Sequence, residues 1–124
     1  MKTETVLLVF EELRDLETYG SMLCGLGYRI LMCNSVAEGI KALETEKVSF
    51  VIASQGTPAF ECRELLERLA QLDPDLPVLV ISRVADMHCY FEAMDLGAID
   101  YLESPTPQEM AWVLDTQMRK SEFD

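Results

Sequence analysis

Four oxygen-bearing side chains stand one or two residues after strand-like runs of this sequence: Glu11, Ser54, Ser82 and Ser104. A carboxylate can ligate a hard cation, and a hydroxyl can act as a nucleophile when a neighbouring base removes its proton. The chain has one histidine, His88, which lies outside these four segments and has no partner suited to catalysis. One carboxylate and three hydroxyls are a poor reaction centre, so we expect no catalytic residues, no cofactor and no enzymatic activity.

The runs that precede these residues alternate with helix-like stretches along the whole chain. They cover residues 6–10, 28–32, 48–53, 78–81 and 99–102. The first, third and fourth runs are almost wholly apolar, as is typical of strands covered on both faces. The second and fifth contain Arg29 and Asp100, which favours the edges of a sheet. The pattern predicts a flavodoxin-like (βα)5 fold: a three-layer α/β sandwich around a parallel five-stranded sheet of order 2-1-3-4-5.

Local signals indicate where the helices begin and end. Residues 35–38 and 106–109 both have the capping-box pattern, in which a hydroxyl and a carboxylate satisfy free backbone N–H groups reciprocally. Gly27 and Gly97 follow helical stretches, and we expect both to adopt the left-handed conformation of a helix C-cap.

Length and composition limit the function classes. The 124 residues fit one domain, 1–124, and the 49% hydrophobic content is enough for a core. The net charge of −12 argues against direct contact with nucleic acid, because phosphate backbones require clustered Lys and Arg. No apolar run reaches the roughly 20 residues of a membrane helix, and no secretory signal is present, so we expect a cytoplasmic protein with no membrane partner.

The four cysteines lie far apart in the sequence and form no closely spaced ligand pair. Structural metal sites need such pairs, so we expect no metal centre. Cys24, Cys33, Cys62 and Cys89 have apolar neighbours, which indicates reduced, partly buried thiols that pack in the core.

At the strand ends the chain resembles the receiver domain of two-component response regulators, over residues 4 to about 120. Such domains begin with an apolar strand that ends in two acidic residues, and here the pair reads Phe10-Glu11. Their third strand ends in a phosphoacceptor aspartate followed four residues later by proline. Residues 54–58 keep that proline and place Ser54 at the acceptor position.

The second half of the chain resembles the same family. Ser82 matches the Ser or Thr that ends the fourth strand. Residues 97–105 resemble the glycine-alanine, aromatic and lysine-proline segment, with Tyr101 at the switch aromatic and Ser104 in place of the lysine. The resemblance leaves two interpretations of Tyr101 open, a retained rotamer switch or a plain edge-strand aromatic.

The departures from the family pattern bear on function. Aspartyl phosphorylation needs a carboxylate nucleophile, Mg²⁺ and a cation for the phosphoryl group. Of the usual three acids only Glu11 remains, and Phe10 brings apolar bulk to this degenerate acidic pocket. We therefore interpret the chain as an atypical receiver that signals by protein contact without phosphorylation. We also expect Arg83 or Arg14 to pair with Glu11 and occupy the place of the metal.

Apolar residues of the last two helical stretches exceed what one buried face requires. In the fifth stretch, Met110, Leu114 and Gln117 form one stripe, so Trp112 and Val113 are expected on its flank. Receivers commonly pair through the fourth helix, fifth strand and fifth helix, so the resemblance implies a homodimer or an effector contact there. The candidate interface residues are Met87, Tyr90, Met94, Trp112 and Val113.

Three alternatives remain open on the sequence alone. A receiver with residual metal binding through Glu11 and Glu12 would still switch weakly. A flavodoxin-like ligand binder would need a loop rich in Gly, Ser and Thr after the first strand, whereas residues 10–15 are acidic and lack all three. Ser54 itself is expected to form simple hydrogen bonds, with modification by a serine kinase as the lesser alternative.

Overall fold

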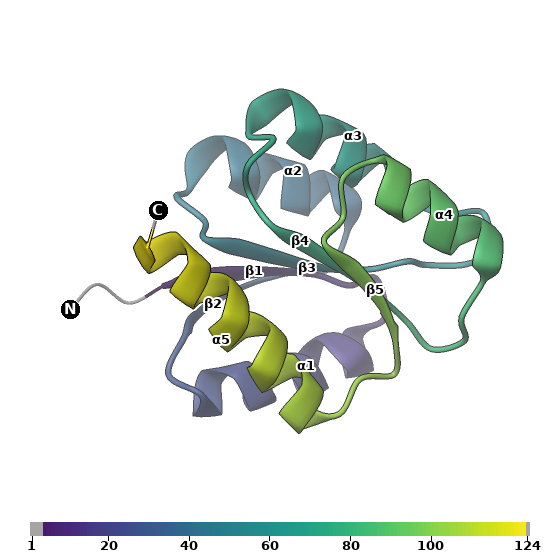
Figure 1. Ribbon diagram of the computed structural model, residues 1–124. Helices are drawn as coiled ribbons and strands as arrows, with labels where there is room; N and C mark the ends of the chain where they lie inside the picture. The colour runs from purple at the N-terminus through teal and green to yellow at the C-terminus, as the bar shows by residue number, and fades with distance from the viewer. Residues whose placement is uncertain (1–3, 124) are drawn as a thin grey trace.

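The computed structural model describes residues 4–123, with the side chains of residues 4–118. A parallel five-stranded sheet lies between two layers of helices (Figure 1). The strands are β1 (Thr5–Val9), β2 (Arg29–Cys33), β3 (Phe50–Ser54), β4 (Val78–Ser82) and β5 (Asp100–Glu103). The helices are α1 (Leu13–Gly25), α2 (Val36–Thr45), α3 (Arg63–Leu72), α4 (Met87–Asp95) and α5 (Pro107–Phe123). Among the described helices, none combines the length and the apolar content that crossing a bilayer requires.

The strand order β2-β1-β3-β4-β5 confirms the predicted flavodoxin-like topology. Strands β1 and β4 are buried along their whole length, and β3 is buried up to its last residue. The polar residues Arg29 and Asp100 lie on the two edge strands, as expected. The first strand has the predicted length but begins and ends one residue earlier: Phe10 lies beyond β1, although its backbone N–H still donates to the Cys33 carbonyl at 3.0 Å.

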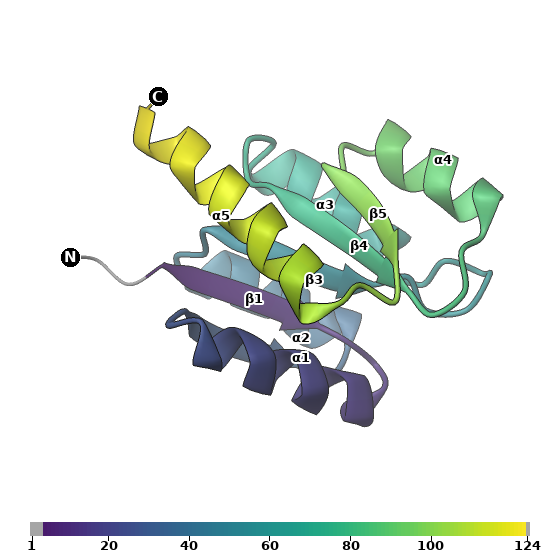
Figure 2. The ribbon, with the colours of Figure 1, turned by 60° about the horizontal axis from the view of Figure 1, so that its bottom comes forward.

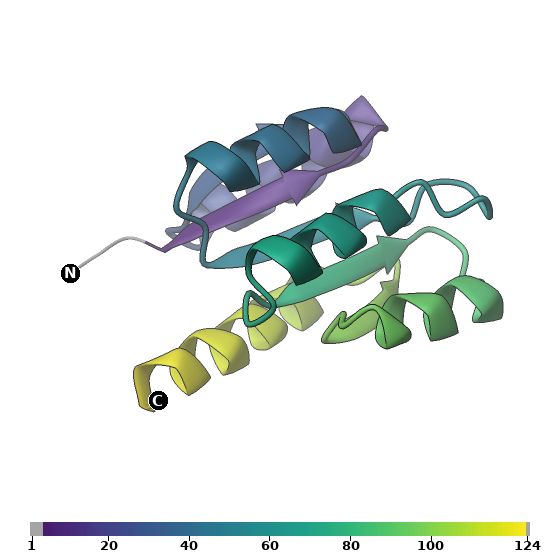
Figure 3. The ribbon, with the colours of Figure 1, turned by 90° about the horizontal axis from the view of Figure 1, so that it is seen from above.

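Alternation along the strands divides the core into two apolar clusters. Leu7 and Val9 pack toward the layer formed by α2, α3 and α4, whereas Val6 and Leu8 pack toward α1 and α5. Figure 2 shows α1 and α5 together on one face of the sheet, and Figure 3 shows the other three helices on the opposite face. Consequently α4 and α5 flank β5 from opposite layers.

The predicted capping box at α5 is complete, whereas the one at α2 forms only in part. At α5 the exchange is reciprocal: the Glu109 N–H donates to the Thr106 hydroxyl at 3.2 Å, and the Thr106 N–H donates to the Glu109 carboxylate at 3.1 Å. At α2 the Glu38 N–H donates to the Ser35 hydroxyl at 3.1 Å. The Glu38 carboxylate, however, accepts from the Asn34 N–H at 2.7 Å, one residue before the position that a capping box predicts.

The two glycines predicted as C-caps have the expected left-handed backbone. Gly27 has φ +93° and Gly97 has φ +101°. Each follows the last turn of a helix and turns the chain into the next edge strand, so both predictions are confirmed.

Candidate functional site

The carboxyl ends of β1, β3 and β4 surround a cavity of about 620 Å³. Glu11, Glu12 and Asp15 line one side, and residues 54–58 and 82–86 line the rest. An adjoining hollow of about 290 Å³ shares Asp15 and several strand-end residues with it and extends to Phe10 and Ser104. The structure thus brings together all four strand-end residues that the sequence singled out, at the edge where parallel α/β sheets bind ligands.

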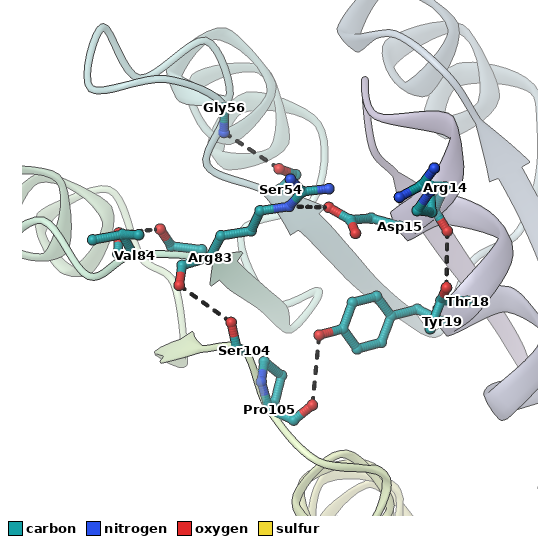
Figure 4. Close-up of polar contacts among 11 residues, drawn as sticks. Arg14, Asp15, Thr18, Tyr19, Ser54, Gly56, Arg83, Val84, Ser104 and Pro105 are labelled. Atoms are coloured by element: carbon teal, nitrogen blue, oxygen red, sulfur yellow. Dashed lines mark hydrogen bonds and ion pairs between the residues drawn. The ribbon is translucent and has the colours of Figure 1, made fainter.

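Ser54 ends β3 and is half-buried. Its hydroxyl oxygen accepts a hydrogen bond from the Gly56 N–H at 3.3 Å, which closes a short turn after the strand (Figure 4). Gly56 has φ +87°, and a Cβ there would lie within 3.0 Å of the Glu61 carboxylate, so this turn requires glycine. Ser54 therefore makes the local hydrogen bond expected of it.

Phe10 packs in the core and lines only the adjoining hollow, not the larger cavity. It is only 1% exposed, packs in the cluster under α1 and α5, and has its ring centroid 5.5 Å from that of Tyr19. The side-chain amide of Asn34 donates to the carbonyls of Phe10 and Glu11 at 3.1 and 2.9 Å, which fixes the chain as it leaves β1. The Glu11 side chain lies on the exposed side and lines the cavity.

The prediction that Arg83 or Arg14 pairs with Glu11 is wrong, because Arg83 pairs with Asp15 instead. Arg83 donates through Nε to the Asp15 carboxylate at 3.0 Å, on the first turn of α1, as Figure 4 shows. This hydrogen bond raises the pKa of the Arg83 guanidinium above its ordinary value. None of the ion pairs among the described side chains joins Glu11 to Arg83 or Arg14. The physical reason is position. Asp15 lies four residues after Glu11, on the first turn of α1, and its side chain faces the end of β4 (Figure 4).

Ser82 and Ser104 bond to the backbone of the loop between β4 and α4. The buried Ser82 hydroxyl donates to the Val84 carbonyl, as a capping role predicts. Ser104 donates through its hydroxyl to the Arg83 carbonyl at 3.2 Å and through its N–H to the Ser82 carbonyl at 2.7 Å (Figure 4). Ser104 has φ +39°, an uncommon backbone conformation for a residue with a side chain. These contacts connect the end of β5 to the end of β4.

Tyr101 is buried, and its side chain reaches the cavity-lining segments from within. Its hydroxyl donates to the Oε1 atom of Gln55 and accepts from the Asp86 N–H at 3.1 Å. The ring packs edge-on against Tyr90, with centroids 5.7 Å apart. Sequence reasoning did not single out Gln55, although a large amide directly after a buried strand was a signal that could have been noticed.

The five candidate interface residues divide into three kinds. Met87 and Trp112 are 71% and 70% exposed, whereas Tyr90 and Met94 are half-buried against the core. Val113 is only 9% exposed and belongs to the core cluster with Met110 and Leu114, so its expected place on the exposed flank is wrong. The buried stripe of α5 is wider than the spacing of residues 110, 114 and 117 indicated. Two further exposed apolar residues, Val84 before α4 and Phe91 within it, were not among the candidate interface residues.

The remaining candidates lie away from the cavity or have unreactive surroundings. His88 is exposed on α4. Cys24 is exposed, and Cys33, Cys62 and Cys89 are buried free thiols. Burial raises the pKa of Cys62 to about 12 and that of Cys89 to about 11, so both remain protonated at neutral pH. Among the described residues, no group of three or more His, Cys, Asp or Glu side chains is arranged to hold a metal ion.

Comparisons with known proteins agree with this geometry. A family model described as the response regulator receiver domain matches residues 6–114. The transcriptional regulatory protein ZraR of Klebsiella oxytoca is 23% identical over 100 residues, which cover 81% of this chain and 23% of that protein. The chain therefore spans less than a quarter of this relative's length.

Solved structures show the same fold. A CheY-like receiver domain protein from Methanospirillum hungatei superposes with a TM-score of 0.89 and 20% identity, over 98% of both chains. The beryllofluoride-activated NtrC4 receiver domain dimer matches with a TM-score of 0.83 and 18% identity, over 94% of this chain and 97% of that one. At such identities the likeness establishes the fold.

Proposed function

This chain belongs to the family of response regulator receiver domains of two-component signalling, and we propose that it signals there without aspartyl phosphorylation, through protein–protein contacts. The observation that carries the proposal is Ser54. A serine ends β3 at the position where the family's acceptor aspartate stands, and its hydroxyl oxygen accepts from Gly56. Serine attacks phosphorus only when a base activates it. The titratable side chains that line this cavity are carboxylates and one arginine.

The donor set supports the proposal, because it does not fit a resident Mg²⁺. Mg²⁺ prefers near-octahedral oxygen ligands that include carboxylates. Of the acidic pair at the end of the first strand, one position is the buried Phe10, which offers only its backbone carbonyl, and that carbonyl already accepts from Asn34. Asp15 is neutralised by Arg83. Of the other lining carboxylates, Asp86 caps α4, which leaves Glu11 and Glu12 on one side of an open cavity that Ser54 also lines.

The position of the phosphoryl-binding lysine is also altered. Ser104 stands there, and its hydroxyl donates to the Arg83 carbonyl. A hydroxyl carries no charge with which to stabilise a transferred phosphoryl group. Among the residues that line the two cavities, Arg83 is the one cation, and it is held by Asp15. We therefore propose that the domain 1–124 catalyses no reaction and holds no cofactor.

The proposed output is contact with a protein partner. Receiver domains work with effector domains and can form dimers, and the similar NtrC4 structure is described as a dimer. Met87 and Trp112 are the exposed apolar members of the candidate interface, with Tyr90 and Met94 beneath it. Exposed apolar side chains on the two helices that flank β5 support a homodimer or effector contact at the α4–β5–α5 face. We propose that this contact is made in the cytoplasm and involves no nucleic acid.

A second candidate function is favoured by one observation. Glu11 and Glu12 both line the cavity, so a receiver with residual metal binding and weak switching would use them. A flavodoxin-like ligand binder has less support, because the segment after β1 presents carboxylates where a phosphate-cradling loop would present backbone N–H groups.

Incubation with acetyl phosphate and Mg²⁺, followed by intact-mass analysis, tests the proposal. We expect no gain of a phosphoryl group in the natural chain. Ser54→Ala is the matched control, because any phosphoryl gain that persists in it lies elsewhere. Ser54→Asp restores the acceptor and shows whether the rest of the pocket can still support the reaction. A phosphoryl adduct that requires Ser54 in the natural chain would overturn the proposal, and Mg²⁺ calorimetry separates out the metal-binding alternative.

A further inference from the structure

Gln55 is the residue whose position the proposed function leaves unexplained. It follows Ser54 directly, and only 2% of its surface is exposed. Burying an amide is costly unless both its N–H and its C=O groups find partners. A buried glutamine at the end of a central strand therefore indicates that its side chain has a specific partner.

Both ends of the Gln55 amide are used. Nε2 donates to the Thr57 carbonyl at 3.3 Å, within the same turn. Oε1 accepts from the Tyr101 hydroxyl, 46 residues away on β5. The backbone of Gln55 is fixed as well, because its N–H donates to the Ile81 carbonyl at 2.8 Å. The amide thus points from a rigid backbone position to the tip of a buried tyrosine.

The Tyr101 hydroxyl passes this constraint on to α4. It accepts from the N–H of Asp86 at 3.1 Å, and Asp86 is the N-cap residue of α4, with Oδ1 accepting from the Cys89 N–H at 3.0 Å. The result is a continuous hydrogen-bond chain, Gln55–Tyr101–Asp86. It joins the segment after β3, the middle of β5 and the first turn of α4.

A second set of contacts holds the residues just before Asp86. The Ala85 N–H donates to the Glu103 carboxylate at 2.8 Å. The Arg83 carbonyl accepts from Ser104, and the Val84 carbonyl accepts from Ser82. Each residue from 83 to 86 therefore has one backbone group that bonds to a side chain. These side chains belong to β4, to β5, or to Ser104, which directly follows β5. Gln55 adds the contact that determines where the Tyr101 hydroxyl points.

We propose that Gln55 is a positioning residue that holds Tyr101 in the inward orientation and, through it, holds the loop before α4 in one conformation. Both partners of the Tyr101 hydroxyl, the Gln55 amide and the Asp86 N–H, belong to the protein itself. This inference deepens the proposed function and rests on it in one respect: a domain that receives no phosphoryl group needs an internal constraint to present α4. The exposed side chains Met87 and Phe91 lie on the helix that is fixed in this way.

Amide hydrogen exchange on the domain alone, without Mg²⁺ or a phosphodonor, tests the inference. Gln55→Met keeps the length of the side chain and removes both hydrogen-bonding groups, and Tyr101→Phe removes only the hydroxyl. We expect exchange at Ala85, Asp86 and Cys89 to accelerate about tenfold in either variant, the effect of losing one buried hydrogen bond. The double variant should exchange no faster than the faster single variant, because both changes break the same chain.

Tyr19→Phe is the matched control. It also removes a tyrosine hydroxyl, but one whose contact is with the Pro105 carbonyl at 3.5 Å, near the start of α5. It should leave exchange at residues 85–89 unchanged. The inference would be overturned if Tyr101→Phe left the exchange rates of residues 85–89 unchanged. It would also be overturned if the rate increase in the double variant equalled the product of the increases in the two single variants. Tyr101→Phe keeps the test decisive if Gln55→Met fails to fold. A phosphoryl adduct at Ser54 would contradict the proposed function and leave these exchange results unaffected, so the two failures are distinguishable.

Discussion

The two halves of the strand-end edge differ in what their side chains do. At the ends of β1 and β3, Phe10 is buried in the core, and the Ser54 hydroxyl accepts from the Gly56 N–H in the turn that directly follows β3. At the ends of β4 and β5, Ser82 and Ser104 bond to the loop before α4, and Tyr101 within β5 bonds to Asp86. In the function that we propose, the residues at the phosphoryl-transfer positions of the family are replaced, whereas the residues that bond to the loop before α4 form a connected set. The proposal therefore assigns to this edge the presentation of a surface and no reaction.

The largest expected effect comes from restoring an acid to the first half. Phe10→Asp would place a carboxylate in an apolar cluster and remove an aromatic ring from it. We expect the free energy of unfolding to fall by about 3–5 kcal/mol or more, from the lost packing and the cost of burying a charge. Urea denaturation monitored by circular dichroism measures this.

Glu11→Asp is the control for that change, because it alters the neighbouring exposed side chain and should shift stability by less than about 0.5 kcal/mol. If Phe10→Asp proved as stable as the natural chain, position 10 would be able to offer a carboxylate to the cavity, and the contrast between the two halves would fail.

A smaller effect distinguishes the two serines. Ser82→Ala removes a buried hydroxyl and leaves the Val84 carbonyl without that donor, so we expect a loss of about 1 kcal/mol. Ser54→Ala removes a half-buried hydroxyl that makes one local bond, and we expect a loss of at most about 0.5 kcal/mol. Thermal denaturation of the two variants beside the natural chain makes the comparison. Equal losses of stability would show that the two hydroxyls contribute equally to the free energy of unfolding, contrary to our expectation.

The smallest expected effect is the pH dependence around α4. The Cys89 N–H lowers the pKa of Asp86 below its ordinary 3.8, and Arg63 lowers the pKa of Glu92 below 4.5. Because both values are lower in the folded state, these carboxylates stabilise the fold above their ordinary pKa values, and this contribution is lost as the pH falls through the folded values. We therefore expect constant stability from neutral pH to about pH 5 and a decline below about pH 4.5 from these two groups.

Asp86→Asn is the matched variant, since an asparagine can still cap the helix but does not titrate in this range. Its stability should fall less between pH 5 and pH 3 than that of the natural chain, as followed by thermal denaturation. An equal fall in both would show that Asp86 contributes nothing to the acid response.

The fold could be predicted from the sequence because its determinants are local or periodic. Buried strands are apolar along their length, and the edge strands include Arg29 and Asp100, so burial alone arranges the sheet. The caps at residues 35 and 106 depend on neighbours three residues away. The strand ends were also predictable, and with them Glu11, Ser54 and Ser82 as residues that line the cavity.

The partners within the site could not be predicted because they depend on distances between loops. Arg83 bonds to Asp15, 68 residues away, and nothing in either segment distinguishes Asp15 from Glu11 as the partner. Tyr101 and Gln55 are 46 residues apart and meet only once β3 and β5 are on either side of β4. Val113 was misplaced for a similar reason, because the rotation of α5 on the sheet decides which residues beside the stripe are covered.

Nuclear magnetic resonance titration of the domain with beryllofluoride and Mg²⁺ tests most directly whether the strand-end edge is inert. Beryllofluoride mimics a phosphoryl group on an acceptor carboxylate, so its binding would require an acceptor acid and a metal site. We propose that the cavity around Ser54 provides neither. We expect the backbone amide resonances of residues 54–57 and 82–86 to stay unchanged at a large excess of both reagents. Saturable shifts at those residues would contradict signalling without phosphorylation.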